Sequence, residues 1–217
     1  MSSPYMKKSS SSKQWLRRHV NDPYVQRSKK EGYRSRSAYK LTEIDDRDRI
    51  VRPGMVAVDL GAAPGGWSQV LARRLGKAGT LVAIDLLDME PIPGMTFLKG
   101  DFASDTGLEA VLHALAGRKA DLVVSDMAPN MSGIALSDQA RSMELAEIAR
   151  DFALLHLKSP GGAFLVKVFQ GAGYDEYLKS LRRAFAKVVV RKPEASRDES
   201  AEQYLLARDL KEMPPRG

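Results

Sequence analysis

The chain has 217 residues and contains no cysteine, which excludes disulfide bonds, thiolate nucleophiles and zinc or iron–sulfur sites held by cysteine. Hydrophobic residues make up 43% and charged residues 28%, as in a globular protein, and no apolar run approaches the ~18 residues of a membrane helix. The formal net charge is +7, and residues 1–40 hold eleven Lys and Arg against two acids, so the basic excess lies entirely in this segment.

The basic N-terminal part divides into two predicted segments. Residues 1–13 are rich in Ser and Lys and have no apolar centre, which predicts a disordered basic tail rather than a secretory signal. Residues 14–48 have a mostly polar helical pattern, with aromatic rings among the cations at Trp15, Tyr24, Tyr33 and Tyr39. Cations attract phosphates and rings stack on bases, so this segment is predicted to bind RNA, although a solubilising tail would carry a similar charge. The expected phosphate contacts are Arg17, Arg18, Lys29, Lys30, Arg34 and Arg36.

From residue 49 onward, short apolar strands alternate with helices. Strands are predicted at 55–60, 80–85, 95–100, 120–125, 162–169, 187–190 and 202–207, and helices at 66–74, 107–115, 138–157 and 174–185. This alternation predicts one α/β domain over residues 49–211, with a mainly parallel seven-stranded sheet and helices on both faces. The last two strands have no helix between them, so they are predicted to be antiparallel to each other.

The first predicted strand ends in Asp59-Leu-Gly-Ala-Ala-Pro-Gly-Gly-Trp67, which is typical of a strand-to-helix turn that holds a nucleoside cofactor. Gly61 and Gly65 let the backbone approach a ligand closely. A dinucleotide site would have the pattern G-x-G-x-x-G, but Ala63 stands at its second glycine. S-adenosyl-L-methionine carries no phosphate and suits this loop better. An NAD(P)-dependent oxidoreductase and a tight turn without a ligand remain as alternatives.

Acidic residues stand at the ends of three further strands, at Asp85, Asp101 and Asp126. Ligands of open α/β sheets bind beyond the carboxyl ends of the strands, so we expect these carboxylates to surround one ligand. Asp85 is placed to accept ribose hydroxyls, and Asp126 to lie beside the methyl donor. Asp101 is placed at the adenine edge, unless it is a helix N-cap. The motif after Asp126 lacks the Pro-Pro-aromatic ending that is typical of amino-group methylation, which favours a hydroxyl acceptor.

Lys167 interrupts an otherwise apolar strand. Burial of an ammonium group is costly unless it is paired, so the strand predicts a carboxylate partner. A lysine held in this way can act as a general base. The alternative is a lysine at a sheet edge whose ammonium group reaches water. A non-catalytic RNA-binding assembly factor would have no need of such a lysine.

Five segments together resemble the FtsJ/RrmJ heat-shock family, the bacterial large-subunit ribosomal RNA 2′-O-methyltransferases. They are residues 34–41, 58–69, 125–133, 166–171 and 191–197. The resemblance extends over nearly the whole chain beyond the first dozen residues. It implies a Rossmann-like class I methyltransferase fold and S-adenosyl-L-methionine as the cofactor.

The resemblance also implies the roles of individual residues. It places a tetrad for 2′-hydroxyl methylation at Lys40, Asp126, Lys167 and Glu202, with Lys167 as the proton acceptor. The implied cofactor contacts are Gly65, Trp67, Asp85, Asp101 and Asp126, to which the glycine loop adds Gly61. Glu199 competes with Glu202 for the last tetrad position, and Glu202 is preferred because it opens the last strand, just before its tyrosine.

The implied substrate is a uridine in the A-loop of 23S rRNA within the 50S subunit, and tRNA or cap RNA are the alternatives. We expect a monomeric cytoplasmic enzyme that neither holds a metal ion nor binds a membrane.

Overall fold

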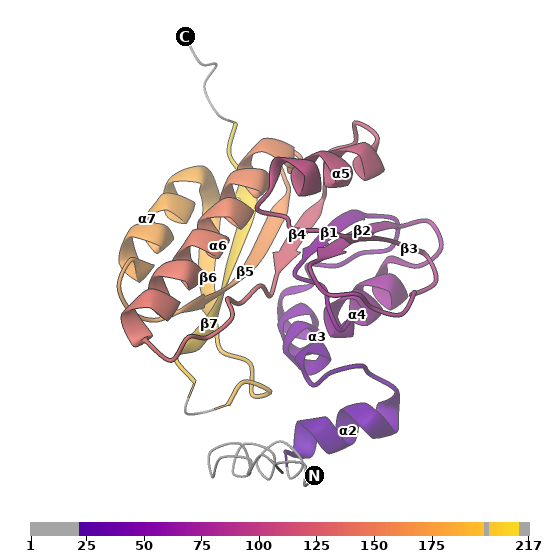
Figure 1. Cartoon of the computed structure of the whole chain (residues 1–217). Helices are drawn as coiled ribbons and strands as arrows, with labels where there is room; N and C mark the ends of the chain where they lie inside the picture. Colours follow the sequence, from indigo (N-terminus) through magenta and orange to yellow (C-terminus); the bar gives the residue numbers. More distant parts are fainter. Residues whose placement is uncertain (1–21, 198–199, 213–217) are drawn as a thin grey trace, which may run out of the picture.

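The computed structural model describes residues 22–197 and 200–212 as one α/β domain (Figure 1). The strands of its sheet are β1 (Val56–Leu60), β2 (Thr80–Asp85), β3 (Met95–Lys99), β4 (Leu122–Ser125), β5 (Ala163–Phe169), β6 (Phe185–Arg191) and β7 (Glu202–Leu210). The helices of the described part are α2 (Pro23–Glu31), α3 (Ser37–Asp48), α4 (Gly66–Leu75), α5 (Asp105–Leu115), α6 (Ala135–His156) and α7 (Tyr174–Ala184).

The sheet has seven strands in the order β3-β2-β1-β4-β5-β7-β6. Strands β1 to β5 pair in parallel, and β7 is antiparallel to both of its neighbours, β5 and β6. The predicted Rossmann-like methyltransferase architecture, with an antiparallel last strand, is therefore confirmed. The strand order reverses between β1 and β4, and such a reversal is where open α/β sheets bind ligands beyond their carboxyl ends.

Two apolar clusters hold the helices to the two faces of the sheet. Helices α3 and α4 cover one face, where Leu41 and Leu71 pack on Leu165 and Leu206. Helices α5, α6 and α7 cover the other face, where residues such as Phe152 pack against the sheet. Within the described ranges, no helix combines the length and apolar character needed to cross a membrane.

The N-terminal helices are joined to the domain by their own aromatic residues. Tyr39 of α3 is buried, and its ring centroid lies 5.5 Å from those of Tyr24 and Tyr33. The Arg27 guanidinium lies 4.6 Å from the centroid of the Tyr39 ring. These rings fasten α2 to α3, which corrects the expectation that they stand free to stack on bases. Trp15, also expected to stack, lies outside the described residues.

The cations predicted to contact phosphates differ in their surroundings. Arg34 donates to the carbonyl oxygens of Glu90, at 2.6 Å, and Pro91, at 3.0 Å, so it joins the turn before α3 to the loop after β2. Lys29 and Lys30 are exposed. Arg17 and Arg18, like the predicted tail over residues 1–13, lie outside the described residues.

Some predicted boundaries differ from the structure. The single helical pattern over 14–48 is interrupted after Glu31, because Gly32 adopts a φ of +74° and caps α2. At the other end of the chain, α7 passes directly into β6 at Phe185, whose buried side chain and pairing with Leu210 favour the strand. Helix α3 shares its core with α4, so the RNA-binding unit proposed for 14–48 includes a helix that is packed into the main domain.

Candidate active site

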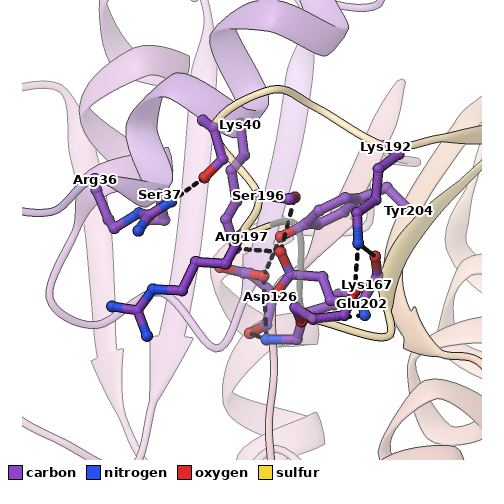
Figure 2. A network of polar contacts seen from close by, with 12 residues as sticks. Arg36, Ser37, Lys40, Asp126, Lys167, Lys192, Ser196, Arg197, Glu202 and Tyr204 are labelled. Atoms are coloured by element: carbon purple, nitrogen blue, oxygen red, sulfur yellow. Dashed lines mark hydrogen bonds and ion pairs between the residues drawn. The ribbon is translucent and has the colours of Figure 1, made fainter. Parts of the chain in front are cut away.

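Lys167 lies in the interior of the sheet, since β5 is flanked by β4 and β7. Its Nζ donates to the carbonyl oxygen of Asp126 at 2.7 Å and lies 3.1 Å from Oδ1 of the same residue (Figure 2). The Lys167 side chain is only 8% exposed. The alternative of an edge lysine that reaches water is therefore wrong, and the ammonium group has the carboxylate partner that its burial requires.

The strand register explains how the other predicted tetrad members reach this lysine. Lys167 pairs with Tyr204 of β7, so both side chains lie on the same face, and Glu202 shares it two residues earlier. Helix α3 covers this face. Lys40 of α3 can therefore meet β7, and its Nζ lies 2.5 Å from Oε1 of Glu202.

Lys40 is not the only residue that holds Glu202 in place. Its Oε1 also accepts a hydrogen bond from Ser196 Oγ at 2.9 Å, and its backbone carbonyl accepts one from Lys192 Nζ at 3.0 Å. Both donors come from the segment between β6 and β7, as Figure 2 shows. The competing acid, Glu199, lies outside the described residues. The contacts of Glu202 favour it as the fourth member of the cluster.

Tyr204 joins the two ion pairs, although the sequence alone did not single it out. Its Oη donates to Asp126 Oδ1 at 3.0 Å, and its ring centroid lies 5.6 Å from Lys40 Nζ. Burial raises the pKa of Tyr204 well above its usual range, and the charges of Asp126 and Glu202 raise it further. The hydroxyl therefore stays protonated and serves as a fixed donor. Its position two residues after Glu202 was the available sequence signal.

A cavity of about 310 Å³ lies beside this cluster, at the carboxyl ends of the first four strands. Its lining includes Gly61, Asp85, Asp101, Phe102, Asp126 and Met127. The volume falls at the lower end of the range for small-molecule sites. Asp126 lines the cavity and also contacts Lys167, so the cavity and the tetrad share one carboxylate.

Backbone amides orient the carboxylates of this cavity. Asp85 accepts from the amides of Ala63, at 2.9 Å, and Leu87, at 2.7 Å, one on each oxygen. Each carboxylate oxygen has more than one acceptor position, so both can still receive ribose hydroxyls. Asp101 accepts from the Ala103 amide at 2.9 Å. The N-cap of α5 is Ser104, so the alternative reading of Asp101 as the cap is wrong.

The three predicted loop contacts differ in position. Gly61 has a φ of +79°, and a Cβ there would lie 2.5 Å from Met127 Cγ, so only glycine fits against this cavity wall. Gly65 and Trp67 do not line the cavity, and the buried Trp67 ring donates to the Ser37 carbonyl at 2.9 Å. Helix α4 has no side-chain N-cap. Backbone amides in the first turn of such a helix are in general suited to bind an anion.

Asp59 adds a buried carboxyl beneath the loop. Its Oδ2 accepts from Ser68 Oγ at 2.6 Å, and its Oδ1 has no hydrogen-bond partner within the described residues. Burial raises the pKa of Asp59 to about 7, against the opposing effect of the Ser68 hydrogen bond. The negative charges of Asp126 and Asp85 raise it further. This mutual repulsion favours a ligand with positive charge, and the ammonium and sulfonium groups of S-adenosyl-L-methionine meet that condition.

Comparison with known proteins identifies the family. The family model for FtsJ-like methyltransferases matches residues 33–210 of the chain. The chain belongs to the FtsJ-like methyltransferase family. It is 58% identical over 206 residues to ribosomal RNA large subunit methyltransferase E of Azoarcus sp. (strain BH72), covering 95% of this chain and 100% of that protein. The enzyme of the same name from Pseudomonas aeruginosa is 54% identical, with 95% and 99% covered.

A solved structure agrees with this assignment. A putative ribosomal RNA methyltransferase from Plasmodium falciparum superposes with a TM-score of 0.73 at 28% identity, covering 82% of this chain and 98% of that one. The predicted resemblance is thus confirmed, and the chain is a methyltransferase. FtsJ-like methyltransferases depend on S-adenosyl-L-methionine, which removes the NAD(P)-dependent oxidoreductase as an alternative.

Proposed function

We propose that this FtsJ-like methyltransferase methylates the 2′-hydroxyl of a uridine in the A-loop of 23S rRNA, acting as a cytoplasmic monomer on the 50S subunit. The observation that carries the proposal is the buried Lys167–Asp126 pair at the wall of the cavity. The names of the relatives support rRNA as the substrate. The family resemblance supports the choice of uridine and of the A-loop.

Lys167 is the proton acceptor in this proposal. A hydroxyl is a poor nucleophile until its proton is removed, and a positioned base contributes typically ~10²–10⁴-fold to the rate. In this step Nζ of Lys167 is a neutral amine, and its lone pair takes the proton from the 2′-oxygen. Asp126 then holds the resulting ammonium group through the two contacts already present, at its carbonyl oxygen and at Oδ1.

Tyr204 and the second ion pair keep these groups in place. The Tyr204 hydroxyl binds the same Asp126 oxygen that faces Lys167, so it fixes the carboxylate against rotation. Lys40 and Glu202 lie on the same face and orient the ribose. Correct alignment of two reacting groups can lower a barrier by roughly 7–11 kcal/mol in favourable cases.

The cavity residues are suited to hold the cofactor. When bound, S-adenosyl-L-methionine supplies an electrophilic methyl group on a sulfonium ion. Asp85 would accept the ribose hydroxyls, and Asp101 would accept from the adenine edge. The amides at the start of α4 would bind the carboxylate.

The test is methyl transfer from labelled cofactor to three substrates. These are 50S subunits from cells without this activity, protein-free 23S rRNA, and tRNA. The proposal predicts that the 50S subunits accept the label and that tRNA does not. Preferential labelling of tRNA would show that the substrate is tRNA and not the 50S subunit. Cofactor binding without transfer to any of the three would favour a non-catalytic RNA-binding role.

The basic N-terminal segment is proposed to bind rRNA phosphates. Deletion of residues 1–21 removes five Lys and Arg and one Trp. The expected result is weaker binding to 50S subunits and a smaller dependence of affinity on salt, with unchanged cofactor binding. An unchanged salt dependence would contradict this role.

A further inference from the structure

A second cavity, of about 240 Å³, opens next to the Lys40–Glu202 pair. It is lined by Arg36, Lys40, Arg197, Ser200 and Glu202. Figure 2 shows Arg36 and Arg197 on the same side of the polar network, beside Lys40. This cavity is separate from the one assigned to the cofactor, because the two share no lining residue.

The charges around this second cavity do not balance. Arg36 forms an ion pair with Asp22, and Arg197 Nε lies 3.7 Å from the same Asp22 oxygen. One carboxylate thus serves two guanidinium groups. Lys40 is neutralised by Glu202. Among the residues that the structure describes here, these three cations and two carboxylates leave one positive charge at the mouth of the cavity.

The two arginines also retain unused donor capacity. Arg36 Nε is buried and has no hydrogen-bond partner within the described residues. Burial lowers the pKa of Arg36, and the nearby charge of Arg197 lowers it further, against the opposing effect of the Glu202 charge. The Arg197 side chain is 48% exposed, so its guanidinium group can reach a ligand in the opening.

The chemistry of RNA indicates which anion belongs there. The 2′-oxygen and the 3′-phosphate are attached to neighbouring carbons of the same ribose. If Lys167, Lys40 and Glu202 hold the 2′-oxygen, the 3′-phosphate must lie within a short distance of them. A guanidinium group is the side chain best matched to a phosphodiester, since it can donate two parallel hydrogen bonds.

We propose that the cavity between Arg36, Lys40 and Arg197 binds the 3′-phosphate of the nucleotide that is methylated. The proposal rests on the 2′-O-methyltransferase function proposed above. It adds that Arg197 is a substrate-binding residue, and that the enzyme recognises the target ribose through a phosphodiester on its 3′ side. The bound phosphate supplies the negative charge that Asp22 provides only in part.

The test compares Arg197→Gln, Arg197→Lys and Arg182→Gln with the wild-type chain in methyl transfer to undermethylated 50S subunits. Arg197 is the residue to change because it is partly exposed, whereas Arg36 is held in an internal ion pair. Arg182 is an exposed control near the end of α7, where β6 begins, and β6 starts beside Leu210, at the other end of β7 from Glu202. Initial rates are measured over a range of subunit and salt concentrations, and cofactor affinity is measured separately.

For Arg197→Gln we expect the KM for 50S subunits to rise about 10-fold, the order of one hydrogen bond to a charged group. The slope of log(kcat/KM) against log[salt] should decrease by about one, because one phosphate contact is lost. Arg197→Lys should keep this slope and show a smaller rise in KM. Arg182→Gln and all cofactor affinities should match wild type.

An Arg197→Gln variant with wild-type KM and salt slope overturns the proposal, and so does an equal loss in Arg182→Gln. A change in kcat alone also overturns it, because that result assigns Arg197 to the alignment of the tetrad. The proposed function fails separately, and removes the basis of this proposal, if the wild-type chain does not label 50S subunits.

Discussion

The two sides of the site differ in charge and in the way that their functional groups are held. On the cofactor side, the carboxylates of Asp85 and Asp101 are fixed by backbone amides of the loops that follow the strands. On the acceptor side, the cation Lys40 is fixed by the Glu202 side chain, and Lys167 by both the backbone carbonyl and the carboxylate of Asp126. Asp126 belongs to both sides, since it lines the cofactor cavity and binds Lys167.

This difference follows from the two ligands that the sides are suited to bind. An excess of carboxylates attracts the positively charged sulfonium cofactor, and an excess of cations attracts the RNA backbone. The comparison predicts that acceptor-side substitutions lower methyl transfer without changing cofactor affinity. Cofactor-side substitutions should weaken cofactor binding, and they should change methyl transfer much less when the cofactor is saturating.

The largest expected effect comes from Lys167→Ala. Loss of the proton acceptor should lower the rate of methyl transfer by about 10²–10⁴-fold, while the Kd for cofactor stays unchanged. Single-turnover transfer to 50S subunits and isothermal titration with cofactor measure the two quantities. Lys158→Ala is the matched control, because this exposed lysine pairs with Asp121. Asp121 comes just before β4, whereas Asp126 follows it, so this pair lies at the other end of the strand. Transfer at the wild-type rate by Lys167→Ala would refute the assignment.

A cofactor-side substitution, Asp85→Asn, should produce the opposite pattern. An amide cannot accept from both the loop amides and the ribose hydroxyls as a carboxylate does, so the Kd for cofactor should rise roughly 10–100-fold. Transfer at saturating cofactor should change much less. Asp88→Asn is the control, since Asp88 is exposed and pairs with Lys99. If the Kd did not change, Asp85 would have no part in binding the cofactor.

A smaller effect is expected for Glu202→Gln, which removes the charge that neutralises Lys40. Transfer should decrease about 10-fold, the order of one charged hydrogen bond, with unchanged cofactor affinity. Glu199→Gln is the matched comparison and should retain wild-type transfer. A larger loss in Glu199→Gln than in Glu202→Gln would reverse the assignment of the fourth tetrad residue.

The last effect concerns stability rather than catalysis and involves Asp59. Its pKa rises from 3.8 to about 7 on folding, so the folded state binds this proton more tightly than the unfolded chain. The contribution of this carboxyl to stability therefore decreases as pH rises from about 4 to about 7, and it stays low above that.

Asp59→Asn removes this dependence and can still accept the Ser68 hydrogen bond. Relative to wild type, its free energy of unfolding should increase between pH 5 and pH 8, by about 1–3 kcal/mol, since each unit between pH 5 and the pKa of Asp59 changes the wild-type stability by up to about 1.4 kcal/mol. Urea unfolding at both pH values measures the difference, with Asp88→Asn as the exposed control. A difference between variant and wild type that is the same at pH 5 and pH 8 would show that Asp59 does not titrate in this range.

Much of the fold could be predicted because its signals are local. The apolar strands, the glycine loop and the acids at the strand ends each occupy a short run of sequence, and the rule that ligands bind beyond strand ends brings them together. The helix-to-strand passage at Phe185 was missed because no turn residue marks it, and burial of the ring decides it.

The parts of the site that could not be predicted depend on contacts between distant residues. The link from Tyr204 to Asp126 depends on the pairing of β5 with β7, for which a single sequence gives no register. Arg34 was expected to contact phosphate, but the fold places carbonyl oxygens of the loop after β2 around it. Charge alone does not distinguish a cation that binds RNA from one that joins two segments of the protein.

The Lys167 side of the site is proposed to methylate a ribose hydroxyl. The most direct test is nucleoside analysis of undermethylated 50S subunits after reaction with wild-type enzyme and with Lys167→Ala. We expect one new 2′-O-methyluridine in the A-loop with the wild-type enzyme, and its formation about 10²–10⁴-fold more slowly with the variant. A methyl group on a base, or the same 2′-O-methyluridine formed at the wild-type rate by Lys167→Ala, would contradict it.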